Sequence, residues 1–256
     1  MSIVNIVSER GGAWLRLVMD APRGNLLSLA MVRDLRAALQ EASRQPGLKW
    51  LTIEGAGPDF SYGAKIQEHL PGPMREVLPE TIALTRDLLH VQALTGALVH
   101  GRCLGGGFEL ALACDDILAG EDAVFGLPEI RLAAFPPMAA ALLPPRVGAS
   151  RASRAVVTGE VLTAGYWHDA GLVSIVAPQA TLDEAAGAWF DRHLAPRSAA
   201  ALTCAVEASR LALRAAALPV LEAAERLYLD GLLATHDAAE GIQAWIDKRP
   251  PAWQDH

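Results

Sequence analysis

Three consecutive glycines at 105–107 separate two short apolar runs in the middle of the chain. The first run, 97–100, predicts a strand, and the second, 106–114, predicts a buried helix. Glycines at such a junction let the backbone approach a ligand closely, and the free N–H groups of a helix N-terminus attract an anionic oxygen. The chain therefore has to form a strand-to-helix turn that suits contact with a ligand.

Two glutamates lie close to this turn in the sequence. Glu109 stands in the predicted helix, where its neighbours at 110–113 are all apolar, and Glu129 follows Pro128 in a loop after a predicted strand at 123–125. The ordinary alternatives are an exposed glutamate near a helix N-terminus and a solvated loop carboxylate. A lone carboxylate on an apolar helix favours a function. Two carboxyl groups in one pocket can divide acid and base work, which addition of water to a carbon–carbon double bond requires.

Nucleotide-binding loops are the main competing interpretation of the glycines. A phosphate-binding loop needs Lys-Ser or Lys-Thr where Phe108 and Glu109 stand, and a dinucleotide loop needs glycine in place of Leu110. The remaining alternative is a tight junction that binds no ligand.

Composition narrows the class of protein. Hydrophobic residues make up 52% of the 256 residues, enough for a sizeable core, and the net charge of −7 argues against general nucleic-acid binding. Cys103, Cys114 and Cys204 lack metal-ligand spacing and the seven histidines do not cluster, so we expect reduced thiols and no metal. There is no signal-like start and no apolar run of about 18 residues, which predicts a cytoplasmic protein without membrane association.

The pattern of elements predicts an α/β fold of repeated β-β-α units around a core sheet. Strands are expected at 3–7, 14–19, 49–54, 97–100, 116–119 and 123–125, and Ser28 is expected to cap a helix that runs to residue 42. After residue 182, alanine and leucine dominate and predict helices at 182–194, 199–216, 219–233 and 237–247. We therefore divide the chain into a core, 1–181, and a helical region, 182–256.

Three segments carry a family resemblance. Residues 99–111 (VHGRCLGGGFELA) resemble the signature segment of the crotonase (enoyl-CoA hydratase/isomerase) superfamily, residues 123–130 resemble its second catalytic segment, and residues 60–64 resemble its first oxyanion-hole segment. The resemblance implies a crotonase-like spiral of β-β-α repeats with a C-terminal helical subdomain for oligomerisation and CoA cover. It also implies a homotrimer or a hexamer built from two trimers.

The resemblance further assigns roles to individual residues. It implies that Glu109 activates water and Glu129 exchanges a proton with the substrate, while backbone N–H groups of Tyr62 and Gly106 hold the thioester oxygen. No bound cofactor is implied, because coenzyme A enters as part of the acyl-CoA substrate. Contacts to CoA or substrate are implied for Ser61, Gly63, Ala64, Lys65, Ile66, Gly105, Pro128, Trp245 and Lys248.

Some of these roles have equal alternatives. Lys65 stands where the family commonly has aspartate, and it could bind a CoA phosphate or simply be solvated. Trp245 and Lys248 correspond to residues that often reach a neighbouring subunit's CoA, but a packed aromatic and an exposed cation explain them as well. The three assignments therefore depend on where the fold places these side chains.

The resemblance favours a hydratase, because isomerases of the family often keep only the glutamate that corresponds to Glu129. Residues 132–144 contain prolines where many relatives have glycines, and with residues 60–71 they resemble the hydratases of cyclohexa-1,5-dienecarbonyl-CoA from anaerobic aromatic degradation. This implies a rigid apolar acyl pocket that includes Tyr62 and lies near His69. The alternatives are a double-bond isomerase, a general short-chain enoyl-CoA hydratase and a non-catalytic acyl-CoA-binding subunit.

Overall fold

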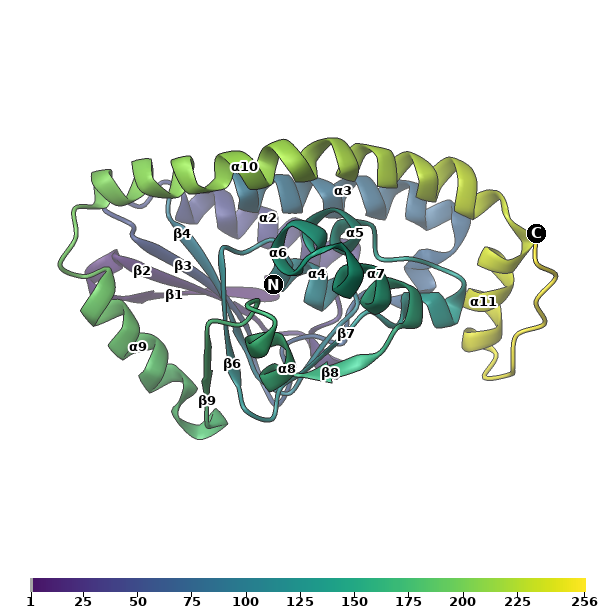
Figure 1. The fold of residues 1–256 in the computed structure, drawn as a ribbon, viewed down its shortest axis with the longest axis horizontal. Helices are drawn as coiled ribbons and strands as arrows, with labels where there is room; N and C mark the ends of the chain where they lie inside the picture. Colours follow the sequence, from purple (N-terminus) through teal and green to yellow (C-terminus); the bar gives the residue numbers. More distant parts are fainter. Residues whose placement is uncertain (1) are drawn as a thin grey trace.

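Two sheets of different size organise the chain, of which the computed structural model describes residues 2–256 (Figure 1). The larger sheet has the strand order β1-β2-β3-β4-β6-β9 and is parallel except for the β1–β2 pair. The smaller sheet has the order β5-β7-β8. The strands are β1 (Val4–Glu9), β2 (Trp14–Met19), β3 (Trp50–Gly55), β4 (Leu94–Val99), β5 (Arg102–Leu104), β6 (Asp116–Gly120), β7 (Val124–Gly126), β8 (Val161–Thr163) and β9 (Ile175–Ala177).

Helices cover the sheets and form the whole C-terminal part of the chain. They are α1 (Pro22–Asn25), α2 (Leu29–Ala42), α3 (Pro71–Leu89), α4 (Gly106–Leu112), α5 (Pro137–Leu142), α6 (Pro144–Val147), α7 (Ala149–Thr158), α8 (Ala164–Asp169), α9 (Leu182–His193), α10 (Ala199–Arg226) and α11 (His236–Ile246). Short 3₁₀ turns lie at Ile66–His69 and Pro128–Leu132, and a π-helical turn at Leu227–Gly231 follows α10. Within residues 2–256, none of the helices combines the length and apolarity that a membrane span needs.

The order of the elements confirms the predicted β-β-α repeat. β4 of the larger sheet is followed by β5 of the smaller sheet and then by α4, and β6 is followed in the same way by β7 and a group of helices. Ser61 bridges to Cys103 after β3, so a third repeat ends in α3. Each turn of this spiral carries the chain from one sheet to the other and leaves a loop at the same edge.

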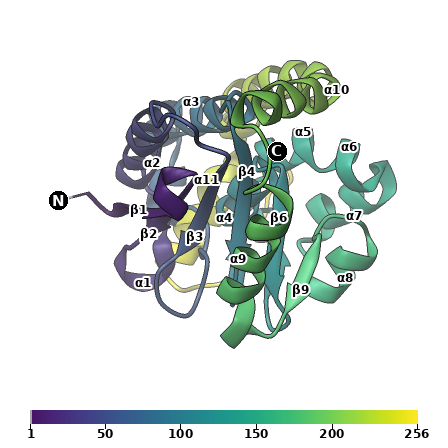
Figure 2. The ribbon, with the colours of Figure 1, turned by 90° about the vertical axis from the view of Figure 1, so that its left-hand side faces the viewer.

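Alternate residues of β3 separate two packed layers. Leu51 and Ile53 belong to the main core cluster under α2 and α3, whereas Trp50 points to the opposite face and packs with Phe190 of α9. Strand β3 is buried along its whole length, as expected for a parallel strand that is covered on both faces. Figure 2 shows α2, α3 and α10 together along one side of the large sheet.

Local signals predicted some elements correctly. The Ser28 side chain accepts a hydrogen bond from Met31 N and caps α2, whose apolar residues at 31, 32, 35, 38 and 39 face the core. Strand β2 has the predicted bounds, and β3, β4, β6 and β7 lie within a few residues of the predicted ranges. Periodicity and capping chemistry therefore sufficed where the elements were short and local.

Two predictions about helices were wrong. The helices expected at 199–216 and 219–233 are one continuous α10 with Pro219 inside it. Proline costs a helix one hydrogen bond, but Ala217 and Leu221 on either side are buried in the main core, and this packing holds the helix together. Helix α3 was not predicted at all, because Pro71, Pro73 and Pro79 resemble a loop signal although the first two lie in the first helical turn, where proline is tolerated.

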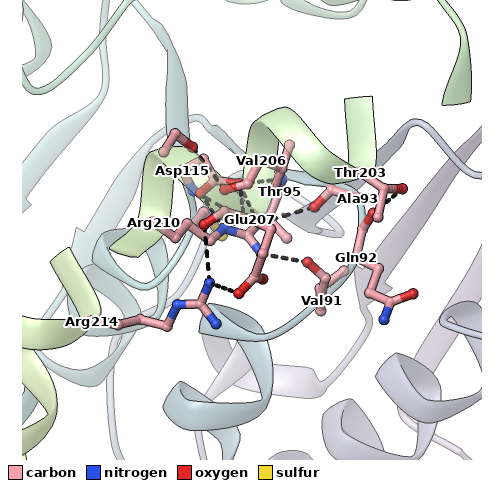
Figure 3. A network of polar contacts seen from close by, with 12 residues as sticks. Val91, Gln92, Ala93, Thr95, Asp115, Thr203, Val206, Glu207, Arg210 and Arg214 are labelled. Carbon is pink, nitrogen blue, oxygen red and sulfur yellow. Dashed lines mark hydrogen bonds and ion pairs between the residues drawn. The ribbon is translucent and has the colours of Figure 1, made fainter. Parts of the chain in front are cut away.

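A buried arginine joins α10 to the larger sheet (Figure 3). The guanidinium of Arg210, whose side chain is 2% exposed, is paired with both carboxylate oxygens of Asp115 at the start of β6. It also donates to the carbonyl oxygens of Val91 and Ala93, which lie just before β4. A further hydrogen bond of 3.2 Å goes to the hydroxyl of Thr95, within β4. Every donor nitrogen of this guanidinium has a partner, so the long helix is held in one position over the core.

Candidate active site

The glycine turn brings Glu129 against the start of α4. Gly105 has φ +50° and ψ −127°, which a residue with a side chain rarely adopts. A Cβ atom at this position would lie 2.6 Å from Oε1 of Glu129. The glycine is therefore required both by the backbone conformation and by the approach of the second carboxyl group.

Glu109 lies in the first turn of α4 and is only 4% exposed. Its Oε1 accepts hydrogen bonds from the backbone N–H groups of Met138, at 2.9 Å, and Ala139, at 3.0 Å, at the start of α5. The proline-containing segment thus turns a helix N-terminus toward the carboxylate, which stabilises its charge. Oε2 of Glu109 has no hydrogen-bond partner among residues 2–256 and is left for a ligand.

The pKa values of both carboxyl groups are raised. Burial raises the pKa of Glu109 to about 7, although the N–H groups of Ala139 and Met138 oppose the shift. Burial, and then the charge of Glu109, raise the pKa of Glu129 well above its ordinary value. Oε2 of Glu129 is buried without a hydrogen-bond partner in the described part of the chain. Burial therefore favours the neutral form of both carboxyl groups, and the charge of one opposes ionisation of the other.

We expect Glu109→Gln to stabilise the fold at pH 8 and to change its stability little at pH 4.5. Because the folded-state pKa of Glu109 is raised from 4.5 to about 7, the folded chain binds more protons than the unfolded chain between these values. The free energy of unfolding then falls as the pH rises from 4.5 to about 7. A neutral glutamine does not ionise, so it avoids this loss of stability, which is about 1–3 kcal/mol. Urea unfolding at both pH values measures it, and equal effects at pH 4.5 and pH 8 would contradict the assignment.

Backbone N–H groups beside the carboxyls were predicted only in part. The Tyr62 N–H donates to the Gly24 carbonyl oxygen at 2.8 Å, so it is not free to hold a substrate oxygen and that prediction was wrong. The N–H groups of Ala64 and Gly106 have no partner among residues 2–256, and Ala64 N lies 3.5 Å from the place of a Cβ atom on Gly106. The two free donors are therefore adjacent and belong to Ala64 and Gly106.

Two cavities meet at these groups. An inner cavity of about 40 Å³ is mainly apolar and is lined by Leu27, Ala64, His69, Met74, Val77, Leu78, Thr81, Gly106, Glu109, Glu129, Phe135, Pro137, Met138 and Tyr228. An outer cavity of about 660 Å³ is lined by Arg23, Leu26, Tyr62, Ala64, Ile66, His69, Arg102, Leu104, Gly105, Pro128, Glu129, Arg131, Leu132, Ala134 and Trp245. Ala64, His69 and Glu129 border both, so a ligand that extends from one into the other passes the free N–H groups.

The predicted contact residues divide into two groups. Ala64, Ile66, Gly105, Pro128 and Trp245 line the outer cavity. Ser61, Gly63, Lys65 and Lys248 line neither cavity. The Ser61 hydroxyl is fully buried, donates to Asn25 O at 2.8 Å and accepts from Gly63 N at 3.1 Å, so its hydrogen bonds are made within the protein.

The structure places three side chains whose roles the sequence left open. Lys65 is exposed and pairs with Glu68 at 3.2 Å. Trp245, half exposed on α11, reaches the outer cavity of its own chain, because α11 packs on the 3₁₀ turns that carry His69 and Glu129. Tyr62 lines the outer cavity, and its hydroxyl accepts a hydrogen bond from Arg102 Nη1 at 2.7 Å.

Several lining residues were missed. Arg23, Arg102 and Arg131 place three cations around the outer cavity. Arg102 lies within the signature segment, so its position beside the glycines was an available signal. The α3 residues of the inner cavity were missed with the helix itself, and Tyr228 lies 99 positions beyond Glu129, so no local pattern connects the two.

Comparison with known proteins agrees with this architecture. The family model for enoyl-CoA hydratase/isomerase matches residues 10–256. The chain is 38% identical over 247 residues to cyclohexa-1,5-dienecarbonyl-CoA hydratase of Thauera aromatica, covering 96% of this chain and 95% of that protein. It is 36% identical over 256 residues to 2,3-dehydroadipyl-CoA hydratase of Escherichia coli (strain K12), covering 96% and 97%.

Solved structures lead to the same family. An enoyl-CoA hydratase from Mycobacterium avium subsp. paratuberculosis K-10 superimposes with a TM-score of 0.83 at 28% identity over the whole of both chains. One from Mycobacterium avium gives 0.84 at 28% identity over 99% of this chain and 100% of that one. The predicted fold and enzyme class are thereby confirmed: this chain belongs to the enoyl-CoA hydratase/isomerase family.

Proposed function

We propose that this chain adds water to the conjugated double bond of an enoyl- or dienoyl-CoA thioester. The observation that carries the proposal is the meeting of the buried Glu109 and the partly buried Glu129 with the free N–H groups of Ala64 and Gly106 around one cavity. Rigid backbone donors are suited to an oxyanion, since they cost no reorganisation as charge develops. Two neighbouring carboxyl groups with raised pKa values can share one proton, so one can act as a base and the other as an acid.

The proposed steps balance with one water molecule. The thioester oxygen accepts hydrogen bonds from the N–H groups of Ala64 and Gly106. These hydrogen bonds draw electron density from the β-carbon. Glu109, ionised near neutral pH, takes one proton from water while the water oxygen bonds to the β-carbon. Glu129 gives its proton to the resulting enolate, and a proton passing from Glu109 to Glu129 restores the pair. The two groups titrate together, so the division of roles belongs to the pair.

The outer cavity suits the CoA part of the substrate. Arg23, Arg102 and Arg131 supply cations for its phosphate groups, and Trp245 supplies an aromatic face. The guanidinium of Arg102 lies 5.4 Å from the ring centre of Tyr62, which keeps this side chain in place at the wall. We therefore assign phosphate contacts to these arginines in preference to Lys65, which pairs with Glu68.

For the acyl group we propose a flat cyclic dienoyl thioester, as in cyclohexa-1,5-dienecarbonyl-CoA. Support comes from the 38% identical relative and from the apolar lining that Pro137 and Met138 share with Met74, Val77 and Leu78. In another protein, a benzene ring binds in an engineered cavity of about 150 Å³. The inner cavity of this chain is smaller, about 40 Å³. A ring therefore enters only if side chains move, and Met74 and Met138 are flexible enough to do so.

We expect kcat/KM to be higher for cyclohexa-1,5-dienecarbonyl-CoA than for crotonyl-CoA, by roughly ten- to two-hundredfold, the range that pocket shape provides. Loss of the conjugated-thioester absorbance measures both rates under the same conditions. A ratio below one would reject the cyclic substrate and leave the hydratase proposal in place.

Reactions in heavy-oxygen water separate the alternatives. A hydratase incorporates the label into the product, whereas a double-bond isomerase yields a shifted double bond without it. Binding of CoA esters without any turnover would indicate a non-catalytic subunit. Labelled product supports the proposal, and either of the other two outcomes replaces it.

We also propose that the chain assembles as a trimer or hexamer. Leu211 and Leu227 on and after α10 are 60% and 61% exposed, and Val220 lies on the same helix with 42% exposure. Large apolar side chains at this exposure favour burial against another subunit. Sedimentation at micromolar concentration is expected to give three or six chains per particle, and a fully active monomer would contradict the proposal.

A further inference from the structure

Tyr228 enters the inner cavity from the C-terminal part of the chain. It lies in the π-helical turn Leu227–Gly231, immediately after α10, and it is only 2% exposed. Its ring centre lies 5.1 Å from that of Phe135, which also lines the cavity, so packing fixes the direction of the side chain. π-Turns are rare and occur often at functional sites. The turn thus brings a phenol into the cavity that contains Glu109 and Glu129.

The hydroxyl of Tyr228 is an uncommitted donor. The other polar groups of the inner cavity are the two carboxyls, the Thr81 hydroxyl and the His69 ring. Thr81 Oγ1 donates to Val77 O at 2.9 Å, and His69 Nδ1 lies 3.4 Å from Lys65 O. Within residues 2–256, no hydrogen bond is formed by Tyr228 Oη. Burial and the two nearby glutamates raise the pKa of Tyr228, so the phenol keeps its proton at every working pH.

A water molecule in this cavity needs a donor opposite its base. An ordered water makes about three hydrogen bonds. The carboxylate of Glu109 is an acceptor, so it can receive a hydrogen bond from the water but cannot donate one to it. Oε1 of Glu109 already accepts hydrogen bonds from two backbone N–H groups, so the water donates to Oε2. The lone pairs of the water oxygen then need a separate donor. The N–H groups of Ala64 and Gly106 are reserved for the thioester oxygen. In the proposed reaction the proton of Glu129 goes to the enolate carbon, which leaves the Tyr228 hydroxyl as an uncommitted donor of the same cavity.

We infer that the Tyr228 hydroxyl donates a hydrogen bond to the oxygen of the attacking water, and to the β-hydroxyl oxygen that this water becomes in the product. The inference rests on the proposed hydratase function and adds a residue that positions the nucleophile. Tyr228 does not change its protonation state, since the proton of the water goes to Glu109. The contact also makes the cavity recognise a hydroxyl on the β-carbon of the acyl group.

Binding of matched ligands to Tyr228→Phe tests the contact. 3-Hydroxybutyryl-CoA and butyryl-CoA differ only in the β-hydroxyl, and calorimetry gives both dissociation constants for the wild-type protein and the variant. Tyr228→Phe is expected to weaken the binding of 3-hydroxybutyryl-CoA about tenfold and to leave the affinity for butyryl-CoA unchanged. The reason is that phenylalanine keeps the packing and removes one hydrogen bond. The kcat for crotonyl-CoA hydration is expected to fall by a similar factor. Tyr166→Phe, on α8 and outside both cavities, is the matched control.

Each outcome decides the inference. Equal weakening of both ligands assigns Tyr228 to packing alone and overturns it, as does unchanged binding of both. A wild-type protein that hydrates no enoyl-CoA contradicts the proposed function. Loss of discrimination in Tyr228→Phe would then still support the hydroxyl contact, because the binding comparison does not depend on turnover.

Discussion

Replacing either Glu109 or Glu129 by glutamine is expected to lower the rate of enoyl-CoA hydration by about a hundredfold or more. Glutamine keeps the size of the side chain and its carbonyl oxygen, so Met138 N and Ala139 N can still donate to residue 109. It cannot take a proton from water, and at position 129 it cannot give a proton to the enolate. The effect should appear mainly in kcat, since the CoA contacts in the outer cavity are unchanged.

The decrease in conjugated-thioester absorbance measures these rates, with Glu184→Gln as the control because Glu184 is exposed on α9. Full activity in either active-site variant would remove that residue from the mechanism. The variants also separate activity from stability. Glu109→Gln is expected to be slower and, at pH 8, more stable, since ionisation of the buried carboxyl group costs the fold stability and the proposed reaction needs the carboxylate.

Arg210→Met is expected to lower the free energy of unfolding by about 3–5 kcal/mol, the usual cost of leaving one partner of a buried ion pair alone. The substitution keeps a long apolar side chain but leaves the Asp115 carboxylate near Thr95 without its cation, and the carbonyl oxygens of Val91 and Ala93 without their donor. Helix α10 then keeps its apolar contacts, the hydrogen bond from Thr203 to Gln92 O and the ion pair of Glu222 with Arg86.

Urea denaturation measures the loss. Arg154→Met is the control, because Arg154 pairs with Glu160 at 2.9 Å and the two side chains are 66% and 38% exposed. The control is expected to cost less than about 1 kcal/mol, as exposed pairs do. The double variant Arg210→Met with Asp115→Asn should recover part of the loss, since it removes the unpaired charge. A loss below about 1 kcal/mol for Arg210→Met alone would show that the network does not hold the helix.

Much of the catalytic centre could be predicted from the sequence, because the relevant signals are local. The glycine turn, the lone Glu109 on an apolar helix and the cap at Ser28 depend on residues within a few positions of one another. The family resemblance extends this to Glu129 and to the β-β-α spiral. Helix α3 and the continuity of α10 through Pro219 could not be predicted in this way, since packing against the core outweighs the local preference of proline.

By itself, the sequence determined strands β1 to β4, β6 and β7, the glycine turn and the two candidate carboxyl groups, whereas β5, β8 and β9 were not predicted. Only the tertiary structure decided which N–H groups are free: Tyr62 donates to Gly24, whereas Ala64 and Gly106 have no partner within residues 2–256. It also decided that Tyr228 shares the cavity of Glu109. The physical reason is that the partner of an N–H group and the approach of residues far apart in sequence are set by packing of the whole chain.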